Sequence, residues 1–415
     1  MKEINNIELF DLNNKGYFFK YHSYFNQFRD MKPWLLINEK EWSYIKENIE
    51  EDVVKDSLTV LLSTYPFPYK EITLEETIED FNKLKNLDIY KMTTDAEWFS
   101  RSSINKDFTD LILSGSNSGN KASNYFQQEN RMKTELENSP SQWRCWTTPN
   151  FTRTLINSFY TLKLKEITDA TIRGALALRK GVASQFKPSI AKYIYDTYNS
   201  ENILDFSGGW GDRLCGFYAS KFGKNFLSID PNENVHKGYD KQIELYSQLC
   251  GDNRKAKTII GCAEDVDLSK FKDKFDTVFT SPPYFNREKY ENQNENQSWF
   301  KFKAIEDWLD NFLFKTISNI EPCIKSGGVL IINISDVCST SKGRKGKGML
   351  EICNPMLDYV DSLDKFHLES IIGYKMSKKP NLKLLGTGVI NNGVGVEKFN
   401  QDVAFGEPVF IWRKK

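Results

Sequence analysis

From about residue 166 onward, short apolar runs alternate with longer segments whose apolar residues recur at helical spacing. The runs predict strands at 202–206, 225–230, 257–262, 275–280, 327–335, 366–376 and 407–415. The segments between them predict helices at 187–198, 211–222, 234–250, 304–324 and 349–363, with a short one at 267–272. This alternation is typical of an α/β fold with a doubly wound, mostly parallel sheet. No helical pattern separates the last two strands, so we expect an antiparallel pair at the sheet edge.

The first 165 residues have a different pattern, which predicts helices and loops. Apolar residues recur at helical spacing in 41–65 and 73–87, whereas 114–124 ("SGSNSGNKASN") reads as a loop or hinge. We therefore divide the chain into a mainly helical N-terminal region, 1–165, and an α/β domain, 166–415. At 415 residues the chain is long enough for two domains.

Composition narrows the class of protein. Hydrophobic residues make up 40% of the chain, enough for ordinary cores, and no apolar run is long enough to span a membrane. The start, "MKEINNIELFDLNNK", is not a signal peptide, so we expect a cytoplasmic protein. The seven cysteines never form a CxxC pair and only three histidines are present, which predicts no zinc or other metal site.

The formal net charge of zero conceals an asymmetry. Residues 1–150 hold 18 basic and 24 acidic residues, a net charge of about −6, and the remainder carries about +6. A polyanion would be steered toward the second part of the chain. The bias is modest and does not by itself establish a nucleic-acid partner.

A glycine-rich turn follows the first predicted strand. In "ILDFSGGWGDRL", Asp205 and Phe206 end the strand, and Gly208, Gly209 and Gly211 precede a helix. Glycines here allow a tight turn and close approach of a ligand to the backbone. The spacing is neither GxGxxG nor a phosphate-binding loop, and close packing of the helix on the sheet is the alternative explanation.

Acidic residues follow the next two strands. Asp230 closes the second strand, where a carboxylate is placed to accept hydrogen bonds from a ribose diol. Glu264 and Asp265 follow the third strand, where an acceptor could meet an adenine amino group. Helix capping is the alternative for each of them. The conjunction of these features at one sheet edge favours a ligand site there.

The fourth strand runs into Thr280-Ser281-Pro282-Pro283-Tyr284. Two adjacent prolines fix two φ angles and restrict the residue before each of them, so this turn is rigid. The Ser281 hydroxyl and the Pro282 carbonyl could accept hydrogen bonds from an exocyclic amine and favour its nucleophilic form. Tyr284 could stack on the base, a contact worth about 1–3 kcal/mol per base in single-strand binders. Holding the amine in line with a reactive methyl group would then supply most of the catalysis.

"SPPY" after the fourth strand, with "DFSGGWG" after the first, resembles the amino-group DNA methyltransferases that use S-adenosylmethionine. The resemblance covers about residues 180–415 and implies a Rossmann-like methyltransferase sheet. It also implies that Phe186 and Pro188, in "SQFKPSIAKYIYDTY", pack on the cofactor.

The serine form of the motif is typical of enzymes that act on cytosine N4, and aspartate is more usual for adenine N6. The glycine turn precedes the SPPY turn, which is the reverse of the commonest arrangement in the N4 enzymes, and it reads GGWG instead of the family's FxGxG. The one Pro-Cys pair, Pro322-Cys323, ends the long helix, which argues against cytosine C5 chemistry.

Two insertions and one loop are candidates for nucleic-acid contacts. The polar segment 286–300 follows the SPPY turn and either closes over the base or is a plain solvated loop. Segment 339–348 holds four cations suited to phosphate contacts, and a second basic insertion spans 375–395. These cations are Lys342, Arg344, Lys345 and Lys347.

The interpretation is a site-specific DNA methyltransferase that modifies an exocyclic amine of a base flipped out of double-stranded DNA, with cytosine N4 slightly favoured over adenine N6. A cytoplasmic or nucleoid-associated location and a cognate restriction nuclease as partner would accompany this role. The N-terminal region or the second insertion would read the target sequence. An RNA methyltransferase of the guanine N2 type and an inactive binding module of the same fold are the alternatives.

Overall fold

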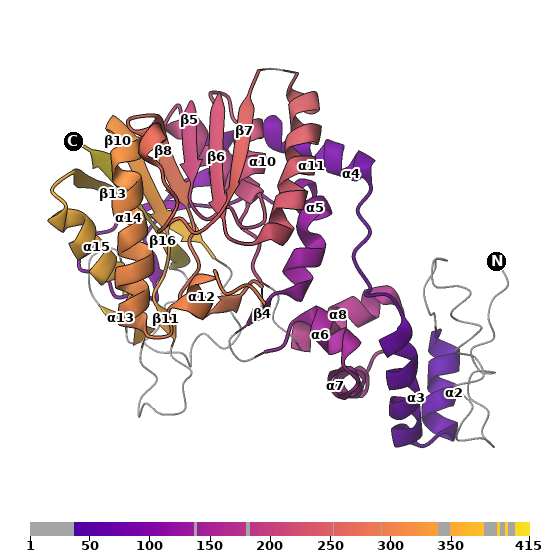
Figure 1. The fold of residues 1–415 in the computed structure, drawn as a ribbon. Helices are drawn as coiled ribbons and strands as arrows, with labels where there is room; N and C mark the ends of the chain where they lie inside the picture. The colour runs from indigo at the N-terminus through magenta and orange to yellow at the C-terminus, as the bar shows by residue number, and fades with distance from the viewer. Residues whose placement is uncertain are drawn as a thin grey trace. The chain divides into compact units, whose positions relative to one another are not determined.

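A computed structural model gives the fold of the chain (Figure 1). It describes residues 37–136, 139–179, 183–251, 253–291, 293–338, 349–376, 388–390, 395–396 and 403–415. Contacts divide the chain into two compact units. The first comprises residues 1–71 and 131–183, and the second comprises 72–130 and 184–415.

The second unit is built on one sheet whose strand order identifies the doubly wound fold. Across the sheet the order is β1-β3-β13-β16-β10-β8-β5-β6-β7. Their bounds are β1 Thr93–Asp95, β3 Leu111–Leu113, β13 Phe366–Lys375, β16 Ala404–Lys414, β10 Ile324–Asn333, β8 Phe275–Thr280, β5 Asn202–Asp205, β6 Asn225–Asp230 and β7 Lys255–Ile260. The five strands from β10 to β7 run parallel, and β16 is antiparallel to both neighbours. The predicted fold class is therefore confirmed.

The last two predicted strands pair antiparallel as expected, but β16 inserts between β10 and β13. The pair does not end the sheet, because the short strand β3 adds to the outer side of β13 and β1 follows it. Both added strands come from residues 89–113, which the sequence pattern left within a helical region. Each is only three residues long, too short for an alternating pattern to reveal it.

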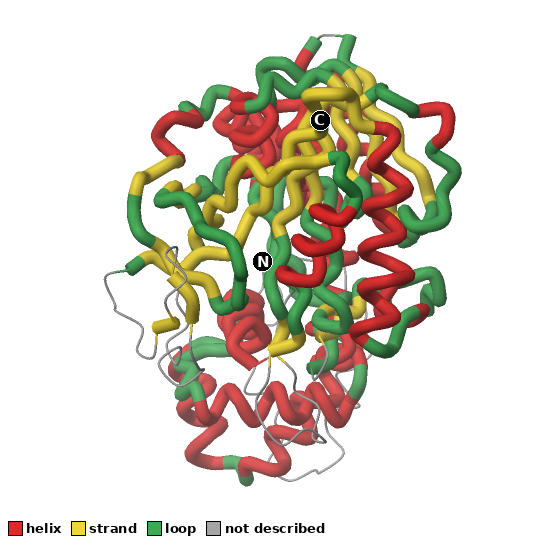
Figure 2. Tube along the Cα trace, turned by 90° about the vertical axis from the view of Figure 1, so that its left-hand side faces the viewer, coloured by secondary structure: helices red, strands yellow, loops and turns green. Residues whose placement is uncertain are grey.

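Helices lie on both sides of the strands (Figure 2). One group, which packs together, is α9 Pro188–Thr197, α10 Asp212–Ala219 and α11 Glu233–Cys250. A second group is α13 Ile305–Trp308, α14 Lys315–Ile320 and α15 Cys353–Ser362, joined by a π-helical turn, η4, at Leu309–Phe314. The sequence predicts one regular helix over 304–324, whereas the structure widens it at the π turn. Trp308, Leu309, Phe312 and Leu313 are all buried there.

Residues 72–130 belong to the unit that holds the sheet, so the contacts do not divide the chain at residue 165. This segment contributes α4 Leu74–Lys85, β2 Trp98–Ser100 and most of α5 Asn120–Lys133. Phe81 of α4 stacks on Tyr246 of α11, with ring centroids 4.7 Å apart. Burial of such aromatic pairs, rather than sequence proximity, decides to which unit the segment belongs.

The first unit is helical, as predicted for much of the N-terminal region. Its helices are α2 Glu39–Asn48, α3 Glu51–Thr64, α6 Gln142–Thr147, α7 Pro149–Thr161 and α8 Asp169–Arg179. A capping box between Asn38 and Glu41 starts α2. Trp42 and Trp146 are buried in its core, among aliphatic side chains of the other helices.

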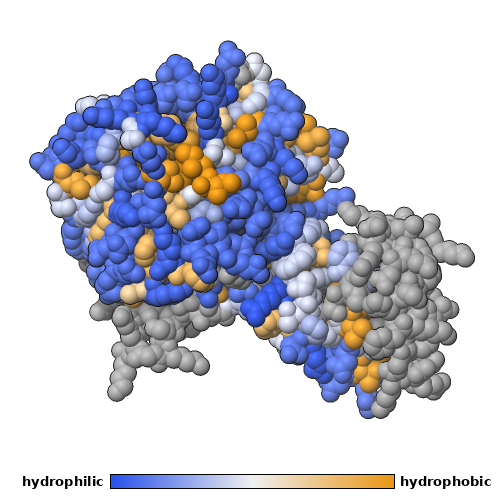
Figure 3. Space-filling view, viewed as in Figure 1, coloured by the Kyte–Doolittle hydropathy of each residue, from blue (hydrophilic) through white to orange (hydrophobic). Residues whose placement is uncertain are grey.

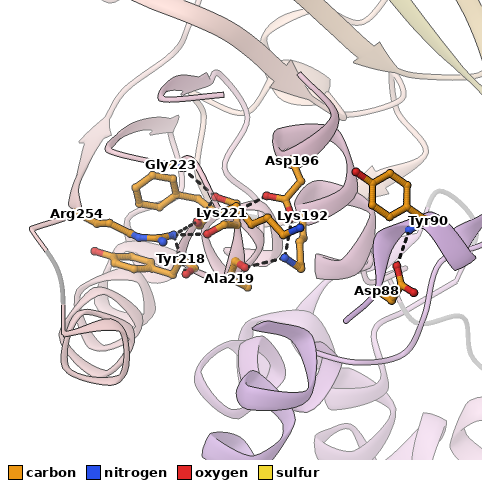
Figure 4. Close-up of polar contacts among 11 residues, drawn as sticks. Asp88, Tyr90, Lys192, Asp196, Tyr218, Ala219, Lys221, Gly223 and Arg254 are labelled. Carbon is orange, nitrogen blue, oxygen red and sulfur yellow. Dashed lines mark hydrogen bonds and ion pairs between the residues drawn. The ribbon is translucent and has the colours of Figure 1, made fainter. Parts of the chain in front are cut away.

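A buried ion pair fixes the helix that carries the glycine turn (Figure 4). Lys192 Nζ lies 2.7 Å from Asp196 on α9, and both side chains are 1% exposed. Lys192 also donates to the carbonyl of Ala219 at the end of α10, at 3.0 Å, and Asp196 accepts from the Lys221 N–H. Arg254 donates to further carbonyls of the same helix end, those of residues 217, 218 and 220. The carboxyl end of α10 is thus anchored, which holds its amino end in place.

The described surface in Figure 3 is mostly hydrophilic, with hydrophobic residues gathered in a few small areas. Among the helices that the structure describes, none combines the length and the apolar character that a membrane crossing requires.

Candidate active site

Two turns of the second unit meet at one edge of the sheet. The glycine turn (residues 206–211) follows β5, and the SPPY turn (residues 281–284) follows β8. The two strands are parallel neighbours, with Leu204 opposite Val278. Their carboxyl ends therefore lie side by side, at the position where open α/β sheets bind ligands.

Asp205 and Thr280 join the two turns directly. The Thr280 hydroxyl donates to Asp205 Oδ1 at 2.9 Å, and Arg213 Nε donates to Asp205 Oδ2 at 2.8 Å. Arg213 also donates to the carbonyl of Ser207. Asp205 is 1% exposed, so its carboxylate is committed to these internal partners. We assign it to holding the turns together, whereas the sequence placed it among the cofactor-binding residues.

Within the glycine turn, two glycines serve different purposes. A Cβ at Gly208 would lie 2.3 Å from Ser228 Oγ and 2.7 Å from the Tyr239 hydroxyl, so close packing on β6 requires this glycine. Gly209 has φ +58°, in the left-handed region, and a Cβ there would come no nearer than 3.8 Å to any other part of the chain. The left-handed φ, and not crowding, therefore accounts for glycine at this position. Gly211 also has positive φ, and it packs against Gln242.

Asp230, at the end of β6, holds the glycine turn by its backbone. Asp230 Oδ2 accepts from the Gly209 N–H at 2.8 Å, and Oδ1 accepts from the Asn232 N–H at 2.9 Å. Burial raises the pKa of Asp230 to about 6, against the opposing effects of the two N–H donors and of His236. Its carboxylate keeps unused lone pairs, so it can still accept a hydrogen bond from a ligand hydroxyl.

Phe186, Pro188 and Phe206 surround this part of the edge. The Phe186 ring is half-buried, 5.7 Å from the Phe279 ring and 5.3 Å from the Arg213 guanidinium. Pro188 is buried as the first residue of α9, and Phe206 is buried in the main core. Phe186 is therefore the one of these three that keeps an exposed part of its ring for a ligand.

Glu264 and Asp265 follow β7 at the same edge and are paired with lysines. Lys301 Nζ lies 2.7 Å from Glu264 and 2.8 Å from Asp265, and Lys315 lies 2.6 Å from Asp265. Hydrogen bonds from both lysines lower the pKa of Asp265. Cys262, Glu264 and Asp265 lie close enough together to hold a metal ion. Lys301 and Lys315, however, already neutralise the two carboxylates. The acceptor role predicted for Glu264 and Asp265 would compete with these ion pairs.

The SPPY turn is held from both ends. Pro282 is buried, and the half-buried ring of Tyr284 packs against the main core. The Tyr284 hydroxyl donates to the carbonyl of Asn333, at the end of β10, at 3.4 Å. Phe285 has φ +50°, a conformation that costs a non-glycine residue about 1–3 kcal/mol. Burial of the Phe285 ring against Trp308, with centroids 6.1 Å apart, offsets this cost.

The segment after the SPPY turn lies over the glycine turn and the ends of β6 and β7. The Tyr290 ring lies 5.6 Å from the ring of Trp210, the tryptophan of GGWG. Asn294 Nδ2 donates to the carbonyl of Pro231 at 2.7 Å, and the Cys262 thiol donates to the carbonyl of Asn296 at 3.3 Å. The described part of 286–300 thus covers the side of the edge that holds the glycine turn. Sequence reasoning missed Trp210 and Tyr290, although the tryptophan inside a glycine turn was a signal for such a contact.

The four cations of 339–348, Lys342, Arg344, Lys345 and Lys347, lie outside the described residues. The same holds for most of the basic insertion at 375–395. Their proposed contacts with phosphates stay predictions from the sequence.

Comparison with known protein families gives one match, which includes the SPPY turn. Residues 275–388 match the family model described as DNA methylase, of the N6 and N4 type. The match begins at β8, includes the SPPY turn and spans somewhat more than a quarter of the chain. None of the curated proteins matches the chain.

Several solved structures are similar in part. One, described as an S-adenosylmethionine dependent methyltransferase from Listeria monocytogenes, is 13% identical, with a TM-score of 0.30 over 55% of this chain and 97% of that one. TrmN from Thermus thermophilus is 12% identical, with a TM-score of 0.31 over 58% and 51%. The N-methyltransferase NodS from Bradyrhizobium japonicum, in complex with S-adenosyl-L-homocysteine, is 8% identical, with a TM-score of 0.29 over 52% and 78%. At these scores the likenesses add nothing to what the strand order shows.

The SPPY turn, its place at the carboxyl edge and the family match agree. The resemblance to the amino-group DNA methyltransferases is thereby confirmed over residues 275–388, and with it S-adenosylmethionine as the cofactor.

Proposed function

We propose that the protein is a site-specific DNA methyltransferase that methylates an exocyclic amine of a flipped base, with cytosine N4 favoured over adenine N6. The observation that carries the proposal is the meeting of the glycine turn and the SPPY turn at the ends of the neighbouring strands β5 and β8. A ligand on the first turn and a base on the second would lie within reach of each other.

The residues around the glycine turn suit S-adenosylmethionine. Glycines in this turn would let a ligand approach the backbone closely, and the Asp230 carboxylate can accept from the ribose hydroxyls. Phe186 is half-buried beside Arg213, and Trp210 and Tyr290 cover the turn. When bound, the cofactor supplies an electrophilic methyl group.

The SPPY turn suits a planar base with an amino group. The Ser281 hydroxyl and the Pro282 carbonyl would accept the two N–H groups of the amine, which favours the nucleophilic form of its nitrogen. The Tyr284 ring would stack on the base. A rigid turn holds these groups without reorganisation, so orientation contributes much of the rate.

Double-stranded DNA as substrate requires that the base leave the stack, because the amine is otherwise out of reach of the turn. The preference for cytosine rests on the serine in the first position of the motif. DNA as substrate rests on the family match over residues 275–388.

A methyl-transfer assay tests the proposal. The protein is incubated with methyl-tritiated S-adenosylmethionine and, separately, with unmethylated DNA and RNA. Label in DNA is expected. Label confined to RNA would replace the proposal with an RNA methyltransferase, and label in neither would leave a binding module.

Tyr284→Ala provides the site-specific control. It removes the stacking ring and leaves every residue of the glycine turn unchanged, so we expect methyl transfer to be abolished and cofactor affinity to stay within a few-fold of wild type. Calorimetric titration with S-adenosylhomocysteine measures the affinity. An equal loss of cofactor binding would show that Tyr284 is structural.

A further inference from the structure

Glu407 lies beside the SPPY turn although it comes from the far end of the chain. It sits on β16, opposite Tyr374 of β13 and two residues before Val409, which pairs with Asn333 of β10. Because β16 is antiparallel to β10, its amino-terminal part lies at the carboxyl edge of the parallel strands. The carboxyl group of Glu407 is thereby brought to the edge that holds the site.

The Glu407 carboxyl group and the SPPY turn are connected by hydrogen-bonding groups. The Tyr284 hydroxyl lies beside both Glu407 and the Ser281 hydroxyl, and the hydrogen bond that it donates at 3.4 Å goes to the carbonyl of Asn333. The side chains of Asn333 and Ser335 are also within reach of Glu407. Neighbouring hydroxyl groups therefore lie between Ser281, where the amine would bind, and a carboxylate. The path closes when the Tyr284 hydroxyl turns from the Asn333 carbonyl to Glu407.

Burial shapes the properties of this path. Burial raises the pKa of Glu407, and the negative charge of Glu288 raises it further, whereas the nearby hydrogen-bond donors lower it. Tyr284 and Tyr374 are the tyrosines that face Glu407, and burial keeps the pKa of Tyr284 well above its ordinary value. A carboxylate with a raised pKa is a better proton acceptor at neutral pH than one in water.

The other carboxyl groups that follow β5, β8 and β10 have partners of their own. Asp205 is ion-paired with Arg213 and accepts the Thr280 hydroxyl. Glu288 accepts from a tyrosine hydroxyl at 2.5 Å and from a backbone N–H. Asp336 accepts three backbone N–H groups. Each is thus committed elsewhere, and none has the Tyr284 hydroxyl as its link to Ser281.

We propose that Glu407 is the terminal acceptor of a proton relay that runs from the substrate amine through Ser281 and Tyr284. The proposal rests on the proposed function, because amine methylation creates the need for it. The nitrogen lone pair forms the new N–C bond, the electrons of the broken bond to carbon leave with sulfur, and the nitrogen is left with one proton too many.

The relay disposes of that proton in three concerted transfers. The amine proton passes to Ser281 Oγ, the serine proton passes to the Tyr284 hydroxyl, and the tyrosine proton passes to the Glu407 carboxylate. Both hydroxyl groups are re-formed, so one proton moves from nitrogen to carboxylate and no electron is transferred. Glu407 later loses the proton to solvent.

Single-turnover rates at pH 5 to 9, with S-adenosylmethionine saturating at each pH, test the relay with Tyr284→Phe and Glu407→Gln. Tyr284→Phe keeps the stacking ring and breaks the path, and Glu407→Gln keeps the shape and removes the acceptor. We expect each to lower the rate at neutral pH by about a hundredfold, the lower end of the usual range for a positioned acid or base. Wild type should lose rate as the pH falls and Glu407 becomes protonated, and both variants should lack this dependence. The double variant should lose no more than either single one, because one path is broken only once.

Glu369→Gln is the matched control, since Glu369 lies on the same sheet but pairs with Arg413. We expect it to keep the wild-type rate and pH profile. A wild-type rate and pH profile in Glu407→Gln would overturn the relay and leave Glu407 a structural residue.

A second readout needs neither cofactor nor substrate. Glu407 is half-buried. A carboxyl with a raised pKa holds its proton in the folded state after the unfolded state has lost it, so folded wild type loses stability as the pH rises through that window. Glu407→Gln lacks the group, so its melting temperature should rise relative to that of wild type as the pH increases from about 4 through the pKa of Glu407. A pH-independent difference would contradict the environment assigned to Glu407. This readout does not depend on methyl transfer, so it separates failure of the relay from failure of the proposed function.

Discussion

Protonation of Asp230 should control cofactor affinity. Its carboxylate ends β6 and is proposed to accept from the ribose hydroxyls, while the backbone N–H groups of Gly209 and Asn232 donate to it. A protonated carboxyl is a poorer acceptor and would also weaken its hold on Gly209. Because burial raises the pKa of Asp230 to about 6, the change falls within a pH range in which binding can be measured.

The size of the effect follows from that pKa. With a pKa of about 6, roughly ten-elevenths of the protein carries the carboxylate at pH 7 and roughly one-eleventh at pH 5. If the carboxylate form alone binds well, the dissociation constant rises about tenfold between these two values, which corresponds to ~1.4 kcal/mol. Affinity is therefore full above the pKa and is lost as the pH falls through it.

Calorimetric titration with S-adenosylhomocysteine from pH 5 to 8 measures this dependence. Asp230→Asn should bind weakly and without the tenfold change, because its amide does not titrate. Asp358→Asn, an exposed position on α15, is the matched control and should behave like wild type. A flat wild-type profile, or an unchanged slope in Asp230→Asn, would refute the assignment of Asp230 to the cofactor.

Two further predictions concern the anchor of α10 and the basic insertion. Lys192→Met leaves the buried Asp196 without its cation and should lower the free energy of unfolding, measured by urea denaturation, by about 3–5 kcal/mol. The double variant Lys192→Met with Asp196→Asn should recover most of this loss. Equal losses in the single and double variants would show that packing, not charge, is decisive. Neutralising the four cations of 342–347 should weaken DNA binding and flatten its dependence on salt concentration, since fewer counterions are released. An unchanged salt slope would return that segment to the role of a solvated loop.

The sheet and the meeting of the two turns were predictable because they follow from local patterns. Apolar runs and helical spacing predicted seven strands, all of which the structure contains, and parallel neighbours place their carboxyl ends together. The SPPY turn and the glycine turn were recognisable because proline and glycine restrict or free the backbone locally. This part of the site required no long-range information.

The partners of charged groups were not predictable in the same way. Asp205 looked like a ligand acceptor, yet Arg213 and Thr280 occupy it. Glu264 meets Lys301 from a segment 37 residues later. A carboxylate at a strand end is available to a ligand only if no cation reaches it, and that depends on the packing of distant segments.

Contacts of short or distant strands were missed for the same reason. β1 and β3 have three residues each, and β3 pairs with a strand some 260 residues away. Glu407 looked like an ordinary residue of a last strand, because nothing in the sequence says that β16 inserts next to β10. The insertion alone brings its carboxyl group to the SPPY turn.

Mass spectrometry of nucleosides is the most direct test of the central claim, that the SPPY turn presents an exocyclic amine of DNA for methylation. DNA treated with the protein and methyl-deuterated S-adenosylmethionine is digested to nucleosides. The account predicts a deuterated methyl group on cytosine N4 or, second, on adenine N6, and none with Tyr284→Ala. Deuterium on cytosine C5, on a ring nitrogen or solely in RNA would contradict it.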